Sequence, residues 1–286
     1  MFHCTEVTFV VVKWSIRMAA LLGIAAVALA QAATLQPGDD PAASPIWLKV
    51  RASLFEGRPI EAAPDGALIL EAPARAVDAA VVPIAIRTRF PHTPSRYVAR
   101  LYLIIDANPS PISAIFQFTP ESGRADVETR VRVDEYSFVR AIAEMNDGRL
   151  YATSRFVKAS GGCSAPAGAD AAAALASMGK TQLRVEGDLN GNVPVLALLQ
   201  INHPNHSGLA MDQVTRQFTP AHYVRKVEVQ YAGKPVFAAD VDFSISENPN
   251  FRFYFLPQAG GELRTTVVDS RDLRFVTTDA PRNAAP

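Results

Sequence analysis

The sequence predicts an all-β fold in which two immunoglobulin-like β-sandwich domains are joined by a Gly-Gly-Cys arm and a short helix. Two separate groups of about seven short segments alternate apolar and polar residues, as the strands of a β-sandwich do. Proline, glycine and asparagine turns separate the segments. With 286 residues, 49% of them hydrophobic, the chain can bury one large core or two modest ones, and the strand spacing favours two.

Residues 1–30 are expected to be a secretory signal peptide. The apolar run Met18–Ala30 follows Lys13 and Arg17 and ends in small residues, as signal peptides do before their cleavage site. The run is shorter than a membrane-spanning helix requires, so no membrane span is expected after cleavage. Residues 1–11 are surplus to this pattern, which suits a start at the valine that follows them. A signal of this kind predicts a periplasmic protein.

Residues 44–159 are expected to form the first sandwich. Ser44–Gly57 is predicted to be a short amphipathic helix that covers one end of this domain, because a serine can cap it, a proline follows and a glycine ends it. From Gly66 onward apolar residues recur at every second position, which indicates strands. In Val127–Val133 they alternate with charges, so one face of that strand should be wet. The predicted strands are Ala67–Leu70, Val81–Arg87, Tyr97–Ile105, Ser113–Phe118, Val127–Val133, Phe138–Met145 and Arg149–Val157.

Residues 181–280 are expected to form the second sandwich, in which the same strand pattern starts again. Ala232-Gly233-Lys234 is predicted to be the turn of a hairpin between its third and fourth strands. The predicted strands are Gln182–Val185, Val195–Ile201, Tyr223–Tyr231, Pro235–Asp240, Phe251–Leu256, Leu263–Val268 and Arg274–Val276.

Residues 160–180 are expected to hold a thiol arm and a linker helix. The sequence has two cysteines, and Cys4 leaves with the signal peptide, so Cys163 has no partner for an internal disulfide. Gly161 and Gly162 predict a flexible tether. Ser164 can cap the helix that follows, and the positive end of its dipole favours a thiolate. We therefore expect an exposed, nucleophilic thiol. The alternative is an ordinary linker whose cysteine is incidental.

Other groups are given no chemical role. His203, His206 and His222 are expected in exposed loops, so no metal site is predicted. A catalytic dyad of Cys163 with one of these histidines or with His92 would need preorganised donors that a mobile arm lacks, so no enzyme activity is expected.

Composition excludes several classes of partner and ligand. Without the segment 1–30, the 28 basic and 28 acidic residues fall to 26 and 27. The net charge is then near −1, and no basic patch for nucleic acid is apparent. The pairs Asp134-Glu135 and Asp240 with Asp242 are interpreted as solvated. No phosphate-binding glycine loop occurs, and no cofactor is expected.

The arm and the segments around it resemble a known family. One set of segments is similar to the end of SoxY, the subunit whose cysteine carries sulfur intermediates in bacterial thiosulfate oxidation: Arg140–Glu144, Asp147–Tyr151, Phe156–Lys158 and Ser160–Cys163. A second set is similar to the partner subunit SoxZ: Ile201–Pro204, Gly208-Leu209, Pro220–Val224, Tyr231–Phe237 and Ser246–Phe253. A chain with both resembles the fused SoxYZ-like carriers found with quinoprotein dehydrogenases.

This resemblance implies a non-enzymatic periplasmic carrier that holds a sulfur species or another small group covalently on Cys163. Its implied partners are redox enzymes, either of the Sox type or a dehydrogenase that uses pyrroloquinoline quinone to oxidise alcohols, and a homodimer through Cys163 is a further expectation. Unlike a SoxY arm, which ends its chain, this arm continues into Ser164-Ala165-Pro166, so we expect a shorter reach. The runner-up is a non-covalent binding or chaperone module for an exported quinoprotein dehydrogenase.

Overall fold

The computed structural model describes residues 35–166, 174, 176–189, 192–212, 215–258 and 260–279. Residues 1–30, the predicted signal peptide, lie outside them, as does most of the predicted linker helix, of which Ala174, Ala176 and Ser177 are described as helical. No helix within the described ranges has the length and apolar character needed to cross a bilayer. The helical elements whose bounds lie within the described residues are η1 (Pro41–Ala43), α1 (Pro45–Phe55) and η2 (Pro120–Ser122).

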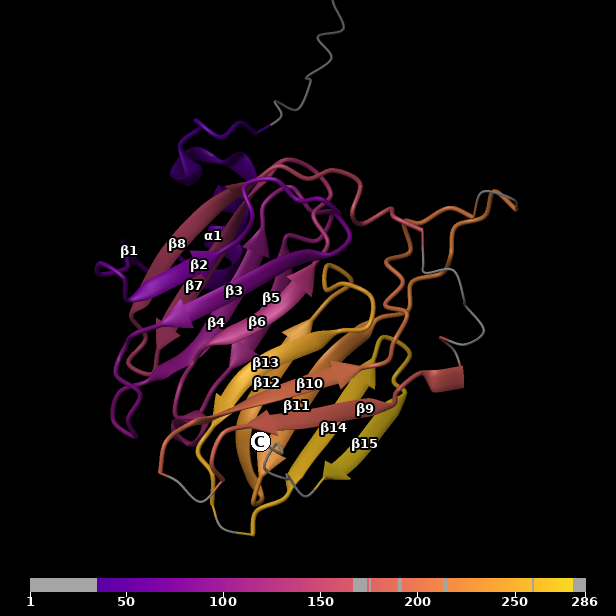
Figure 1. Cartoon of the computed structure of the whole chain (residues 1–286). Helices are drawn as coiled ribbons and strands as arrows, with labels where there is room; N and C mark the ends of the chain where they lie inside the picture. Colours follow the sequence, from indigo (N-terminus) through magenta and orange to yellow (C-terminus); the bar gives the residue numbers. More distant parts are fainter. Residues whose placement is uncertain are drawn as a thin grey trace, which may run out of the picture. The chain divides into compact units, whose positions relative to one another are not determined.

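The described residues are mostly strand, so the predicted all-β class is confirmed (Figure 1). Each predicted strand has a counterpart within a few residues, and β1 is the one that the sequence pattern missed. The strands are β1 (Ile60–Ala62), β2 (Leu68–Glu71), β3 (Val82–Thr88), β4 (Val98–Ile105), β5 (Ile112–Gln117), β6 (Val127–Val131), β7 (Ser137–Met145), β8 (Leu150–Val157), β9 (Thr181–Glu186), β10 (Val195–Ile201), β11 (Val224–Tyr231), β12 (Lys234–Val241), β13 (Asn250–Phe255), β14 (Leu263–Asp269) and β15 (Arg274–Asp279).

These strands form two sheets, and each sheet contains strands from both halves of the chain. The nine-stranded sheet has the order β1-β8-β7-β4-β5-β12-β11-β14-β15, and the six-stranded sheet has the order β2-β3-β6-β13-β10-β9. In Figure 1 the violet and magenta strands of the first half continue into the orange and yellow strands of the second. The predicted hairpin turn joins β11 and β12, where Ala232 and Gly233 both take positive φ angles, as a tight hairpin requires.

The two halves meet edge to edge along a seam in both sheets. In the nine-stranded sheet β5 pairs with β12 in antiparallel fashion, with Phe116 opposite Ala239. In the six-stranded sheet β6 pairs with β13 through Glu128 and Arg252. The two halves therefore share continuous sheets, and the described part of residues 35–286 forms one compact unit.

Aromatic side chains from both halves fill the core beside the seam. Phe237 of β12 lies parallel to Phe253, with ring centroids 4.3 Å apart, and both rings are fully buried. Its ring centroid is also 6.0 Å from those of Phe116 and Phe118, which belong to the first half. A core built in this way couples the stability of one half to that of the other.

Helix α1 covers the outer face of the nine-stranded sheet rather than an end of the first half. Ser44 caps it, since its Oγ accepts a hydrogen bond from the N–H of Trp47. Trp47 and Phe55 pack with Tyr102 and Ile104, which point away from the main core because side chains alternate along β4. With one face against the core and the other under the helix, every residue of β7 is buried.

We predict that replacing Phe237 by alanine destabilises both halves together. The loss of a buried ring should lower the free energy of unfolding by about 3–5 kcal/mol. In the chain without residues 1–30, urea unfolding followed by Trp47 fluorescence, which reports on the first half, should shift together with the far-UV circular dichroism. Val276→Ala, at a half-exposed position on β15, is the matched control and should change the free energy by less than about 0.5 kcal/mol. Two separate transitions would contradict a shared core.

Candidate functional site

The arm that carries Cys163 is docked against the ends of the two sheets. The N–H of Gly161 donates to the carbonyl of Asp134 at 2.7 Å, and the N–H of Gly162 donates to the carbonyl of Val133 at 3.0 Å. The N–H of Cys163 donates to Oδ1 of the Asp134 side chain at 3.1 Å. These bonds continue the line of β6 past its end, so the arm is an ordered turn in this structure.

Gly162 allows an approach that no other residue could make. A Cβ atom at this position would lie 2.1 Å from the carbonyl oxygen of Ala79 and 2.6 Å from that of Val133, and backbone atoms cannot yield as a flexible side chain can. The glycine was expected to supply flexibility. In the docked arm it supplies space.

The second half closes over the arm from the other side. After β10, the hydroxyl of Ser207 donates to the carbonyl of Cys163 at 2.5 Å and accepts from the N–H of Leu209 at 3.1 Å. Figure 1 shows the pink segment after β8 running beside the orange loop that follows β10. We call residues 203–209 the cover segment. The cysteine therefore lies at the seam, between groups from both halves.

The expectation of an exposed, low-pKa thiol is wrong for this conformation. Cys163 is 1% exposed. Burial raises the pKa of Cys163 to about 12, the negative charges of Asp134 and Asp242 add to the rise, and the positive charge of Arg132 opposes it. The thiol is therefore neutral and shielded while the arm is docked, and it becomes a nucleophile only when the arm leaves.

Arg132 and Asp242 make the surroundings of the thiol polar but rigid. The Arg132 side chain is buried, and its Nη1 donates to the carbonyls of Phe243 and Ile245 at 2.7 and 2.6 Å. Burial raises the pKa of Asp242 to about 6, and its Oδ2 has no hydrogen-bond partner among the described residues. The interpretation of Asp134 and Asp242 as solvated carboxylates is corrected, because both act at the docked arm.

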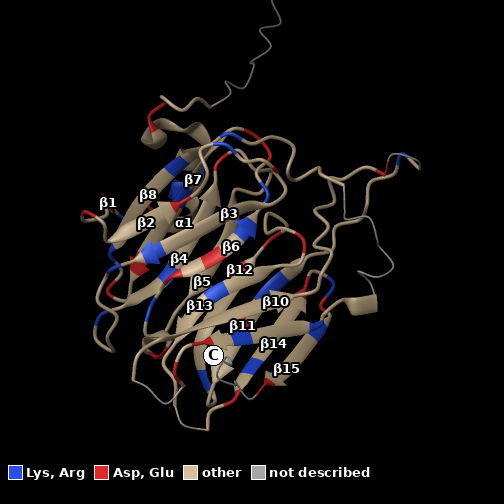
Figure 2. Ribbon diagram, in the orientation of Figure 1, with Lys and Arg blue, Asp and Glu red and all other residues tan. Residues whose placement is uncertain are grey.

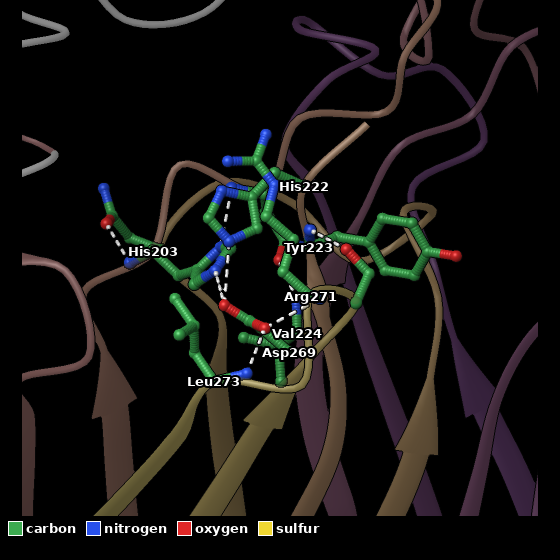
Figure 3. A network of polar contacts seen from close by, with 10 residues as sticks. His203, His222, Tyr223, Val224, Asp269, Arg271 and Leu273 are labelled. Carbon is green, nitrogen blue, oxygen red and sulfur yellow. Dashed lines mark hydrogen bonds and ion pairs between the residues drawn. The ribbon is translucent and has the colours of Figure 1, made fainter. Parts of the chain in front are cut away.

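A buried histidine cluster holds the base of the cover segment (Figure 3). Nε2 of His222 lies 2.8 Å from Oδ2 of Asp269, and Nε2 of His203 lies 3.6 Å from the same oxygen. The expectation that these two histidines are exposed is wrong, since both are at most 2% exposed. Burial alone would raise the pKa of Asp269, but hydrogen bonds from His222 and from the backbone N–H groups of Arg271 and Leu273 outweigh it and lower the pKa.

His203, His222 and Asp269 are also the residues whose spacing comes nearest to a metal site, since one donor atom from each lies within 4.8 Å of the others. The hydrogen bonds do not fit a metal ion. Nδ1 of His203 accepts from the N–H of Asn205 at 3.0 Å, so in the neutral ring the proton is on Nε2, the atom that would have to bind the ion. If Nε2 bound a metal ion, the proton of the neutral ring would have to be on Nδ1, where it would face the N–H of Asn205. We assign the cluster a structural role.

The chain matches two protein families over separate regions. Residues 51–163 match the family described as sulfur oxidation protein SoxY, and residues 185–279 match the family described as sulphur oxidation protein SoxZ. Among curated proteins, none matches this chain.

Solved structures with partial similarity include the sulfur carrier protein SoxY from Chlorobium limicola f thiosulfatophilum. It is 26% identical, covers 39% of this chain and 89% of its own, and has a TM-score of 0.33. Superoxide reductase (neelaredoxin) from Ignicoccus hospitalis is 17% identical, covers 35% of this chain and 94% of its own, and has a TM-score of 0.30.

We predict that Gly162→Ala undocks the arm. Because the added Cβ would overlap the Ala79 carbonyl oxygen, the variant should expose the thiol, and alkylation of Cys163 at neutral pH should become about tenfold faster or more. The rate is measured with a chromogenic thiol reagent on folded protein. Gly38→Ala is the matched control, since its Cβ would meet no atom within 4 Å, and it should react as the parent does. Equal rates for all three proteins would show that Gly162 does not hold the arm down.

We also predict a distinctive pH dependence for alkylation of the unaltered protein. The docked thiol stays neutral up to about pH 12, whereas an undocked thiol ionises near its ordinary pKa of 9.0. Above that value, rising pH therefore favours the undocked arm, by about 1.36 kcal/mol per pH unit. The logarithm of the rate should keep rising past pH 9, while that of Gly162→Ala levels off near it. A plateau near pH 9 in both proteins would argue against a docked thiol in solution.

Proposed function

Because the chain joins a SoxY-family domain to a SoxZ-family domain, we propose that it is a carrier in sulfur oxidation whose Cys163 holds the cargo covalently. The observation that carries the proposal is the position of Cys163: it ends the region that matches SoxY and lies at the seam, under a cover segment from the region that matches SoxZ. A carrier needs a thiol that can be both shielded and presented. The docked arm supplies the shielded state.

Loading requires the arm to undock, since an adduct cannot form at a sulfur that is 1% exposed. In the undocked state the thiol loses its proton, and a bond forms between its sulfur and the sulfur of an incoming anion. The two electrons released by this S–S bond formation pass to a redox partner. The chain itself supplies the attachment point and no catalytic group. Tethering then keeps the intermediate at high effective concentration beside successive enzymes.

The proposal includes a cellular location and partner enzymes for this carrier. We place it in the periplasm on the signal-like run Met18–Ala30. Its partners are redox enzymes of the Sox type or a quinoprotein alcohol dehydrogenase, the setting in which similar fused carriers occur. A disulfide-linked homodimer through Cys163 would require two undocked arms, so it is expected as an oxidised by-product of the presented state.

A second function is favoured by the burial of the thiol. If the arm stays docked, Cys163 is an inert part of the core, and the protein acts as a non-covalent binding or chaperone module for an exported dehydrogenase. The two functions differ in their requirement for the sulfur atom.

We predict that the mature protein, isolated from the periplasm of cells growing on a reduced sulfur compound, carries an adduct on Cys163. Intact-mass measurement before and after mild reductant should show a mass shift that reductant removes. Cys163→Ser should abolish both the adduct and the cellular role, while its urea midpoint stays close to that of the parent. An unmodified thiol under all growth conditions, with full function of Cys163→Ser, would establish the binding module instead.

A further inference from the structure

A large open groove lies on the outer face of the six-stranded sheet, at the seam. This open groove of about 820 Å³ is lined by β3 and β6 of the first half and by β10 and β13 of the second. Pro83, Phe156 and Leu198 contribute apolar walls. Cavities of roughly 300–1,000 Å³ hold drug-sized ligands, so the groove is far larger than a small inorganic anion needs.

Arginine dominates the charge of this groove. Its lining holds four arginines, Arg87, Arg130, Arg155 and Arg252, against two glutamates, Glu71 and Glu128. In Figure 2 blue segments on β3, β6 and β13 surround a red segment on β6.

Both glutamates already form ion pairs with arginines of the groove. Glu128 lies 2.7 Å from Arg87 and 3.3 Å from Arg252, and Glu71 lies 3.5 Å from Arg87. Nη2 of Arg130 lies 3.4 Å from the carbonyl of Asn248, and the side-chain oxygen of Asn250 accepts from Nε and Nη2 of Arg130 at 3.0 and 3.1 Å. Arg155 donates to the carbonyl of Leu70 at 3.3 Å, and among the described residues neither arginine pairs with a carboxylate. The groove therefore presents two positive charges that no carboxylate of the described residues neutralises.

The groove begins where the thiol arm begins. Arg155 and Phe156 line it, and two residues later the N–H of Lys158 donates to the carbonyl of Ala74, another lining residue, at 3.0 Å. On β6, Arg130 stands three residues before Val133, whose carbonyl holds Gly162. Three extended residues span about 10 Å. A molecule seated in the groove would thus contact both the base of the arm and the strand on which its tip rests.

We infer that this groove docks an acidic segment of the partner protein that loads or unloads Cys163. The inference rests on the proposed carrier function, because it names the surface at which the partner engages. Carboxylates of such a segment would pair with Arg130 and Arg155, and its apolar side chains would pack on Phe156 and Leu198. The volume and the mixed lining favour a peptide segment over a small free anion. Charge complementarity next to the arm brings the partner to the thiol and speeds its association.

The test uses the mature protein and a fluorescein-labelled peptide of alternating glutamate and glycine, with a lysine-glycine peptide as its counterpart. Fluorescence anisotropy should show binding of the acidic peptide that weakens with added salt, and little binding of the basic one. Arg130→Glu with Arg155→Glu should weaken acidic-peptide binding by about tenfold or more. Arg225→Glu with Arg264→Glu makes the same change in net charge at exposed positions of β11 and β14, which do not line the groove, and should alter binding less than about twofold.

Three outcomes would overturn the inference. The first is equal binding of both peptides, and the second is unchanged binding of the acidic peptide by the groove variant. The third is displacement of the peptide by millimolar malonate that itself binds the groove, because a small anion would then be the occupant. If the double glutamate variant does not fold, the Arg130→Gln and Arg155→Gln pair keeps the test open with a smaller expected loss. Cys163→Ser should bind the peptide as the parent does. Peptide binding without any adduct on Cys163 would therefore refute the carrier function but not the docking of an acidic segment in the groove. An adduct on Cys163 without peptide binding would refute the docking but not the carrier function.

Discussion

The pairing of β5 with β12 and of β6 with β13 is the constraint on which the rest of the structure depends. A sandwich with open edges presents rows of unpaired N–H and C=O groups, and each half of this chain would leave such an edge in both of its sheets. Joining the halves at these edges satisfies the backbone groups and lets Phe116 and Phe237 share one core. The seam is thus both a set of hydrogen bonds and a packed interior.

The seam also determines what can surround the thiol. The Asp134 carboxylate and the Val133 carbonyl come from the first half, and the Ser207 hydroxyl and Asp242 come from the second. Neither half alone contains the site. A docked thiol with a raised pKa is compatible with a carrier only if docking is reversible, so the energy that holds the arm must be modest compared with the stability of the sheets. The arm is held by a small number of hydrogen bonds, each of which contributes only about 1 kcal/mol, so this condition is met.

The strands were predictable from sequence because their signal is local: alternation along Val127–Val133 and the turn at Ala232–Gly233 need no knowledge of distant residues. The same holds for the capped helix that begins after Ser44. The burial of Cys163 was not predictable, because the groups that hold the docked arm lie far away in sequence: Ala79 beside Gly162, and Asp134 and Ser207 at Cys163. In the local sequence, two glycines beside a cysteine indicate a flexible backbone, yet Gly162 is needed for a close backbone contact. The histidine cluster was missed for the same reason, since Asp269 is 47 residues from His222.

The anchoring of the arm sets a geometric limit on its partners. Lys158 is fixed to Ala74 and Ala76 by backbone hydrogen bonds, and Cys163 follows it five positions later in the chain. A fully extended chain of that length spans at most about 17 Å. The return path to Gly179, which is bonded to Asn202, is much longer in residues and so does not tighten this limit. The sulfur of Cys163 can therefore move only within about this distance of Lys158. An enzyme that reacts with it must bring its reactive centre within that distance when it binds at the seam.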